Sequence, residues 1–141
     1  MKKILIVNSN YYKKISQNLV TSTVKKLSKA KYSISIIDVP GIFEIPFTIK
    51  KNIKKFDAFV ALGCVIKGQT PHFNLICSST FDAITKLSID FGKPIGNGII
   101  TALNNKQAEE RSKKSNSYKP NKGSEAANAV LLTLTNEPKK I

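Results

Sequence analysis

The strongest constraint on the fold of this chain is a regular alternation between short, almost wholly apolar runs and longer runs with one apolar face. An apolar run bounded by turn residues is typical of a strand that is covered on both faces. Apolar side chains spaced by three and four residues indicate helices that lie on a sheet. Strands that alternate with helices favour a parallel sheet with right-handed crossovers. The pattern therefore predicts one doubly wound α/β domain over residues 1–141.

The boundaries of the elements follow from the same pattern. Strands are predicted over residues 3–8, 32–39, 58–66 and 94–102, and helices over residues 15–27, 46–56, 72–91, 106–113 and 124–134. The segment 58–66 is the most apolar and is expected at the centre of the sheet. The helix 46–56 is expected to turn Phe47, Ile49 and Ile53 toward the core. Gly92 is expected to end the helix before it.

The cysteines and the absence of several known motifs exclude some classes of enzyme and binding site. Cys64 and Cys77 lie in apolar stretches and are expected to be reduced and buried, with a disulfide as the alternative. One histidine and two separated cysteines do not make a zinc site. Phosphate-binding glycine motifs and the serine-hydrolase elbow are absent from the sequence. No run approaches the ~20 apolar residues of a membrane span, so we expect a cytoplasmic protein with no membrane partner.

The charge of the chain is unusual, because Lys+Arg 23 against Asp+Glu 9 gives a formal net charge of +14. Such a charge suits nucleic acid, a membrane surface or phosphorylated metabolites. The lysines occur as pairs in several segments rather than in one stripe, and lysine lacks the planar fork of arginine. We therefore prefer compositional drift as the interpretation and expect no nucleic-acid partner. A dedicated polyanion site is the alternative.

Ligands of a doubly wound sheet bind beyond the carboxyl ends of its strands, which selects the loops 8–12, 40–44, 67–72 and 101–105. In the third of these loops, Gly68 lets the backbone approach a ligand, and the helix that follows favours an anion at its N-terminus. Thr70 is a candidate N-cap. His72 is the only histidine, and the helix dipole favours its neutral, proton-accepting ring. A surface or capping histidine is the alternative.

Three other polar or aromatic residues could also bind a ligand. Glu44 could accept hydrogen bonds from a ligand, or could stabilise the start of a helix as an acid in its first turn. Tyr11 could stack on a planar ligand, or could pack with Tyr12. Arg111, the single arginine, could bind a phosphate with its fork, or could form a helix salt bridge with the neighbouring glutamates. The residues together point to acid–base chemistry on a phosphorylated small molecule.

Four longer motifs carry a family resemblance. VPGIFEIP (39–46), ALGCVIKGQTPHF (61–73), the Glu110-Arg111 pair and NKGSEAA (121–127) resemble, in order and spacing, the motifs of the 6,7-dimethyl-8-ribityllumazine synthase family. The resemblance covers nearly the whole chain. It implies a flavodoxin-like three-layer sandwich, with a four-stranded parallel sheet flanked by helices. It also implies an enzyme of riboflavin biosynthesis that works without a metal or organic cofactor.

The resemblance implies a role for each residue of the site. Such enzymes condense 5-amino-6-(D-ribitylamino)uracil with 3,4-dihydroxy-2-butanone 4-phosphate and release phosphate and water. His72 would move protons in this reaction. Phosphate would be bound by Gln69, Thr70, Arg111 and Lys122, with Arg111 reaching in from a neighbouring subunit. The uracil ring and the ribityl chain would be bound by Tyr11, Ile42, Phe43, Glu44, Val65, Ile66, Lys67 and Asn97.

The chain also departs from the family pattern. Tyr12 stands where the family has asparagine, Lys67 replaces a frequent arginine, and Asn97 occupies a position often held by an aromatic residue from the adjacent subunit. The stretch from Arg111 to Gly123 is longer than usual, and in this family a longer connection accompanies free pentamers rather than shells. We therefore expect a homo-oligomer, a pentamer, with active sites at its subunit interfaces. A member that has lost catalysis and serves in assembly is the alternative.

Overall fold

The computed structural model describes residues 1–113 and 121–141 and contains a four-stranded parallel sheet. The strand order is β2-β1-β3-β4. The strands are β1 (Lys3–Ser9), β2 (Ser33–Val39), β3 (Ala58–Ile66) and β4 (Ile95–Ala102). β3 is an interior strand, as its apolar sequence predicts, and β1 lies beside it. β2 is an edge strand, and its residues Ile36 and Ile37 are exposed.

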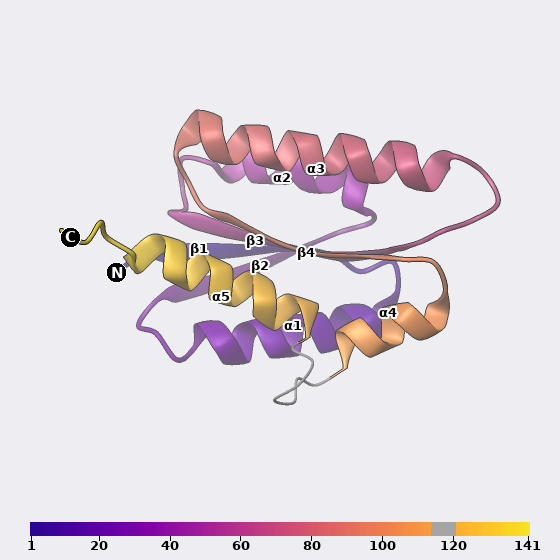
Figure 1. Ribbon diagram of the computed structural model, residues 1–141, viewed down its shortest axis with the longest axis horizontal. Helices are drawn as coiled ribbons and strands as arrows, with labels where there is room; N and C mark the ends of the chain where they lie inside the picture. Colours follow the sequence, from indigo (N-terminus) through magenta and orange to yellow (C-terminus); the bar gives the residue numbers. More distant parts are fainter. Residues whose placement is uncertain (114–120) are drawn as a thin grey trace.

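Helices cover both faces of this sheet (Figure 1). One layer contains α1 (Lys13–Leu27), α4 (Asn105–Ser112) and α5 (Lys122–Thr135). The other contains the short 3-10 helix η1 (Ile42–Glu44), α2 (Ile45–Asn52) and α3 (His72–Phe91). The flavodoxin-like three-layer sandwich is therefore confirmed. Gly92 ends α3 in the left-handed conformation with φ 61°, as expected from its position.

The core consists of two clusters, one on each face of the sheet. Alternate residues of a strand point to opposite faces, so Ile4 and Ile6 pack under α1 and α5, while Leu5 and Val7 pack under α2 and α3. Both faces of β1 and β3 are thus buried, which explains the long apolar runs in these strands.

The helix predicted over residues 46–56 is shorter in the structure and ends at Asn52. The inward orientation of Phe47 is wrong, because 72% of this residue is exposed, whereas Ile49 and Ile53 are buried as expected. Ile45 takes the inward position instead. The sequence pattern failed here because Phe47 follows Ile45 by two positions, which places the two side chains on different faces of a helix.

Among the described residues, no helix is long and apolar enough to cross a membrane. Both described cysteines, Cys64 and Cys77, are buried and free, as the sequence predicts. The pentamer is predicted from the long connection between Arg111 and Gly123. Most of this connection, residues 114–120, lies outside the described residues.

Candidate active site

His72 is the first residue of α3, directly beyond the loop that follows the interior strand β3. Its side chain is exposed and lines a hollow of about 580 Å³. The other residues that line this hollow are Phe43, Leu75, Ile76 and Ser79. The imidazole therefore lies against an apolar wall formed by η1 and by the first two turns of α3.

The loop before His72 leaves the N-terminus of α3 open. Pro71 is the N-cap residue, and no side chain forms a capping hydrogen bond there, so the expected capping role of Thr70 is wrong. Lys67, Gln69 and Thr70 are exposed. The first amide groups of a helix that lacks a side-chain cap can donate to an anion.

The carboxyl end of β2 leads into η1, which brings Ile42, Phe43 and Glu44 to the same end of the sheet. Ile42 is buried, whereas 63% of Phe43 is exposed. Glu44 is half-buried and is the N-cap residue of α2, but its carboxylate forms no capping hydrogen bond. The carboxylate lies over Gly41, where an added methyl group would be 3.3 Å from Glu44 Oε1. Glu44 therefore does not cap α2 with its side chain, while its position in the first turn of η1 and at the start of α2 agrees with the alternative of an acid that stabilises a helix start.

The two tyrosines after β1 have different surroundings. Their rings meet edge to face, with centroids 5.0 Å apart. Tyr12 packs against the core beside α1, and burial raises the pKa of its phenol. Tyr11 is 72% exposed at the carboxyl end of β1. Tyr12 thus serves packing and leaves the ring of Tyr11 accessible to a ligand.

A buried hydrogen-bond network lies at the base of the Tyr11 loop. Asn8 Nδ2 donates to Ser16 Oγ at 2.8 Å and to Asp38 Oδ1 at 2.9 Å. The backbone N–H of Asn10 donates to the Val39 carbonyl oxygen at 3.2 Å. The network joins the carboxyl ends of β1 and β2 to the first turn of α1, so both ends of the loop are fixed. No sequence motif indicated it.

Arg111 does not form the salt bridge that its neighbours suggested. Its Nη1 donates to the Thr101 carbonyl oxygen at 3.1 Å, at the carboxyl end of β4. The ion pairs within the described ranges are Lys86–Asp90 and Lys122–Glu125, the latter with 3.9 Å between Nζ and Oε2. Arg111 and Lys122 belong to α4 and α5 and thus to the layer opposite α3, so one subunit does not gather them with His72 (Figure 1).

Val65, Ile66 and Asn97 are half-buried within the sheet. Val65 and Ile66 are the last two residues of β3, at the same end as His72. Asn97 lies nearer the start of β4, and its Oδ1 accepts a hydrogen bond from the backbone N–H of Ile99 at 3.0 Å. The oxygen of this amide is therefore engaged within its own strand, whereas its Nδ2 group is not bound by this contact.

Two residues of the NKG motif, Asn121 and Gly123, have structural roles. Asn121 is buried, and its Oδ1 accepts from the N–H groups of Gly123 and Ser124, which caps α5. Its Nδ2 donates to the Ser112 carbonyl oxygen at 2.6 Å. A methyl group on Gly123 would lie 2.6 Å from the Leu19 carbonyl oxygen. The structural role of Asn121 was missed, although an asparagine before a helical run is an N-cap signal.

The arrangement suits proton transfer beside an anion. It offers one imidazole, an open helix N-terminus and exposed lysines and aromatic rings near the carboxyl ends of the strands. Within the ranges 1–113 and 121–141, no three histidine, cysteine or acidic residues are grouped as metal ligands. The imidazole and the open helix N-terminus favour acid–base chemistry by His72.

Comparison with known proteins agrees with these motifs. Residues 1–137 match the family model described as 6,7-dimethyl-8-ribityllumazine synthase. A protein of that name from Bartonella tribocorum is 42% identical, with 93% of this chain and 87% of the relative covered. A namesake from Bartonella henselae is 43% identical, with 93% and 85% covered. Another from Zymomonas mobilis subsp. mobilis is 37% identical, with 100% and 99% covered.

Proposed function

The chain belongs to the 6,7-dimethyl-8-ribityllumazine synthase family, and we propose that its active site is the hollow beside His72. The enzyme is a transferase of riboflavin biosynthesis. It condenses 5-amino-6-(D-ribitylamino)uracil with 3,4-dihydroxy-2-butanone 4-phosphate and releases phosphate and water. The amine and the ketone form an imine, phosphate is eliminated, and ring closure yields the lumazine.

The observation that carries the site assignment is the position of His72. The only imidazole of the chain is the first residue of a helix without a side-chain cap, and it lines an apolar hollow. An imidazole at this position accepts a proton from the attacking amine and returns it to the hydroxyl that leaves as water. It then accepts the carbon-bound proton that is lost as phosphate is eliminated. The phosphate group of the substrate is attracted to the helix N-terminus.

Phosphate binding is completed by four side chains. Gln69 and Thr70 donate from the exposed loop before α3. Arg111 and Lys122 belong to the opposite layer of their own subunit, so they reach the hollow of a neighbouring subunit. The guanidinium of Arg111 contributes a two-pronged contact that a lysine cannot replace.

The uracil substrate lies between the exposed ring of Tyr11 and the residues around η1. Glu44 accepts hydrogen bonds from N–H or O–H groups of this substrate, and its freedom from capping supports this role. Ile42, Phe43, Val65, Ile66 and Lys67 form the surrounding walls. The hydrogen bond within β4 orients Asn97 by its oxygen, so its Nδ2 group is what the side chain offers to a ligand. Holding both substrates in attack geometry supplies much of the acceleration.

We infer a homo-oligomer because the residues of the proposed site lie in opposite layers of one subunit. A homo-oligomer places Arg111 of one subunit beside His72 of the next, and the long connection after Arg111 supports a free pentamer. The small-molecule substrates need neither a membrane nor a metal. We place the enzyme in the cytoplasm.

The test of the activity is incubation with both substrates while the absorbance and fluorescence of the lumazine are recorded. Wild-type protein forms the product, and folded protein that forms none contradicts the proposed activity. The His72→Ala variant should lower kcat by roughly 10- to 10⁴-fold because it lacks the acid–base group.

The matched control for His72 is Asn74→Ala, which removes another exposed side chain from the first turn of α3. This control should retain wild-type kcat. An unchanged kcat in His72→Ala would reject the role of the imidazole while leaving the activity itself in place.

A further inference from the structure

Ten of the lysines that are scattered in the sequence lie at one end of the molecule. In a parallel sheet all strands begin at the same end, which we call the amino end. The residues just before or at the starts of three strands include lysine pairs: Lys2 and Lys3 at β1, Lys29 and Lys31 before β2, and Lys54 and Lys55 before β3. The last turns of α1 and α2 add the pairs Lys25–Lys26 and Lys50–Lys51 at this end.

Some of these lysines have a structural explanation. The pairs in the last turns of α1 and α2 are favoured by the helix dipole. Lys93 Nζ donates to the carbonyl oxygens of Ile53 and Phe56, so it holds the connection between α2 and β3. Neither reason applies to the side chains of the lysines in the two loops 28–32 and 53–57.

The loop lysines are not neutralised by neighbouring acids. Asp57 accepts a hydrogen bond from the backbone N–H of Lys3 at 2.7 Å, and Asp90 pairs with Lys86 at 2.8 Å. Of the ion pairs within 4.0 Å in the described parts of the chain, none includes Lys29, Lys31, Lys54 or Lys55. Their charges therefore face solvent and add to one another.

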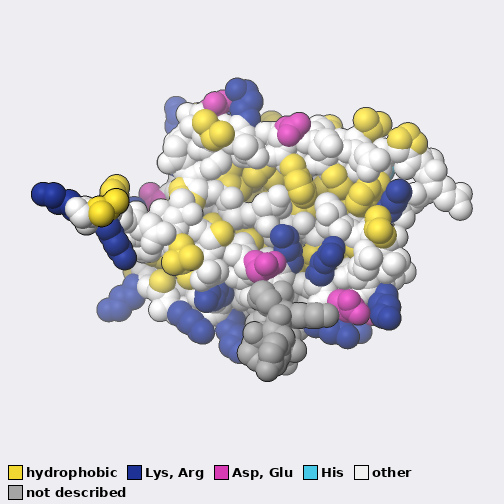
Figure 2. Space-filling model, viewed as in Figure 1, with side chains coloured by type: hydrophobic (Ala, Val, Ile, Leu, Met, Phe, Trp, Pro, Cys, Tyr) yellow, Lys and Arg dark blue, Asp and Glu magenta, His cyan; other side chains and the backbone are white. Residues whose placement is uncertain are grey.

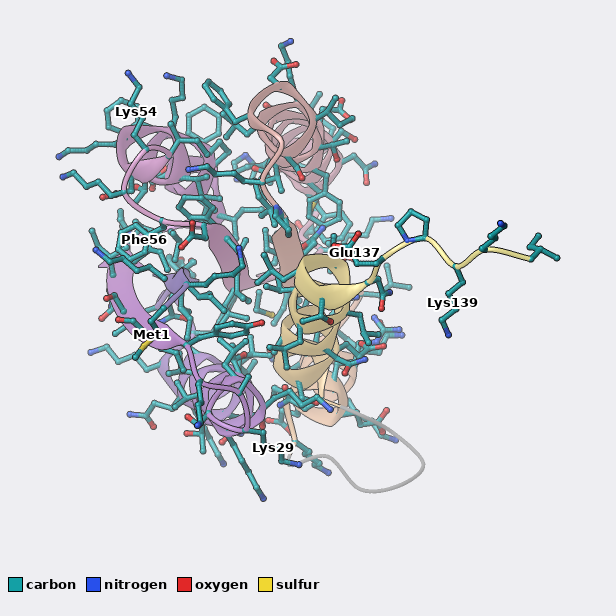
Figure 3. The ribbon with its side chains drawn as sticks, turned by 90° about the vertical axis from the view of Figure 1, so that its left-hand side faces the viewer. Met1, Lys29, Lys54, Phe56, Glu137 and Lys139 are labelled. Carbon is teal, nitrogen blue, oxygen red and sulfur yellow. The ribbon has the colours of Figure 1, made fainter. Side chains whose placement is uncertain are left out.

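The shape of the amino end suits an extended ligand. In Figure 2, dark blue Lys and Arg side chains lie at the left-hand end of the molecule, which is the amino end, and also along the lower edge and toward the right-hand end. Figure 3 looks onto this end and shows Lys54 and Lys29 on opposite sides, with Met1 and Phe56 between them and Lys139 on the C-terminal tail. The hollow beside His72 lies roughly 26 Å away along β3, given ~3.3 Å per strand residue. A polymer can follow charges distributed in this way, whereas a small anion cannot reach them together.

We propose that the amino end binds the sugar–phosphate backbone of RNA without reading its sequence. Lysines provide point charges for phosphates, while base recognition uses arginine forks and exposed aromatic rings. Phe56 and Tyr32 are half-buried, and Lys50 Nζ lies over the Phe91 ring, 5.0 Å from its centroid. The exposed side chains of the loops 28–32 and 53–57 are lysine, serine and aspartate. Met1, Ile89 and Phe91 are exposed elsewhere at this end, so binding to anionic vesicles is measured beside binding to RNA.

From the sequence alone we expect compositional drift and no nucleic-acid partner, and the topology of the sheet changes this expectation. Drift was preferred because the lysine pairs are spread over several segments, but the parallel topology brings those segments to one end. The site does not depend on the enzymatic activity, and its residues are separate from those of the catalytic hollow.

The test measures binding of the full chain to a fluorescently labelled 20-nucleotide oligouridine by anisotropy between 50 and 200 mM salt. The test variant changes Lys29, Lys31, Lys54 and Lys55 to glutamine together. Each phosphate contact contributes about 0.7 to the slope of log affinity against log salt, so the slope should fall by about 3 in magnitude and the affinity at 50 mM salt by at least about tenfold. Thermal unfolding and lumazine formation should stay at wild-type values.

The matched control changes Lys13, Lys14, Lys106 and Lys113 to glutamine, which removes the same charge from exposed positions toward the other end. This control should bind RNA within about threefold of wild type, since only the general charge is reduced. Absence of RNA binding by wild type at 50 mM salt would overturn the proposal. Equal losses in the two variants, or tighter binding to phosphatidylglycerol vesicles than to RNA, would overturn it as well.

Discussion

The guanidinium of Arg111 is held by a main-chain oxygen rather than by a neighbouring acid. A single hydrogen bond to the Thr101 carbonyl leaves most of its donors for a phosphate. Arg111→Ala should therefore raise the KM for the phosphorylated ketone by about 10- to 100-fold, since a hydrogen bond between charged groups contributes about 1.5–3 kcal/mol. Steady-state kinetics with each substrate varied in turn measure this effect.

Arg111→Lys is the control for charge alone. It should recover only part of the lost affinity, because an ammonium cannot form the two-pronged contact. A KM change confined to the uracil substrate would contradict the phosphate assignment.

Cys64 illustrates how burial affects a single residue in a measurable way. Burial raises the pKa of its thiol to about 11. The unfolded chain loses this proton near pH 9, so the contribution of the protonated thiol to stability is complete below pH 9 and is lost as the pH rises toward 11. The free energy of unfolding should fall over this interval by roughly 1–2 kcal/mol more in wild type than in Cys64→Ala.

Denaturant titrations of both proteins at several pH values provide this comparison. The lysines titrate in the same interval but are shared by the two proteins, so the difference isolates the thiol. Parallel pH profiles would show that Cys64 ionises as freely in the folded as in the unfolded state.

At the scale of elements, the contact between α1 and α5 depends on the absence of a side chain at Gly123. A methyl group there would lie 2.5 Å from Thr23 Oγ1 and 2.6 Å from the Leu19 carbonyl oxygen. Gly123→Ala should reduce the free energy of unfolding by about 1–3 kcal/mol, because the two helices must move apart. Gly68→Ala is the matched control, since its added methyl group meets nothing within 4 Å. Equal destabilisation of the two variants would refute the packing argument.

The elements themselves could be predicted well from the sequence, and the reasons are local. The strands β1 and β3 are buried on both faces, so residues 4–7 and 58–66 are apolar apart from Gly63, while α3 carries a continuous apolar stripe that ends at Gly92. The helix predicted over residues 46–56 is longer than α2, because the end of α2 depends on a tertiary contact. The carbonyl oxygen of Ile53 is bound by Lys93, which is distant in the sequence.

The position of the candidate site could be predicted from the topology of the sheet. The rule that ligands bind at the carboxyl ends of parallel strands selected the loops that contain Tyr11, Glu44 and His72, and these loops lie at one end of the sheet. The network of Asn8, Ser16 and Asp38 could not be predicted, since it depends on the register between β1 and β2. Nor can side chains from another subunit be located from the pattern of one chain.

At the scale of the whole molecule, the layer containing α2 and α3 leaves large apolar side chains uncovered. Phe47 is 72% exposed and Leu75 is 67% exposed. Exposed apolar surface of this kind is typical of an interface, which supports the proposed homo-oligomer. Wild-type protein should therefore show a mass about five times the 15.5 kDa of one chain in light scattering.

Leu75→Asp should lower that mass, because a charge in an apolar interface is not compensated. Ile141→Asp is the control, since Ile141 is exposed on the C-terminal tail beyond α5. A monomeric wild type or a closed shell of many pentamers would contradict the pentamer. An unchanged mass in Leu75→Asp would remove this face from the interface.

The hydrogen bond from Asn121 to the Ser112 carbonyl has a consequence for engineering. Because the end of α4 and the start of α5 are bonded to each other, the fold does not depend on how many residues connect them. A peptide epitope could be inserted between these two helices with little thermodynamic penalty, since loop-closure entropy grows only slowly with length. Arg111 adjoins this junction, so in the proposed homo-oligomer the inserted peptide would be displayed beside the contact between copies, where its size could control how many copies assemble.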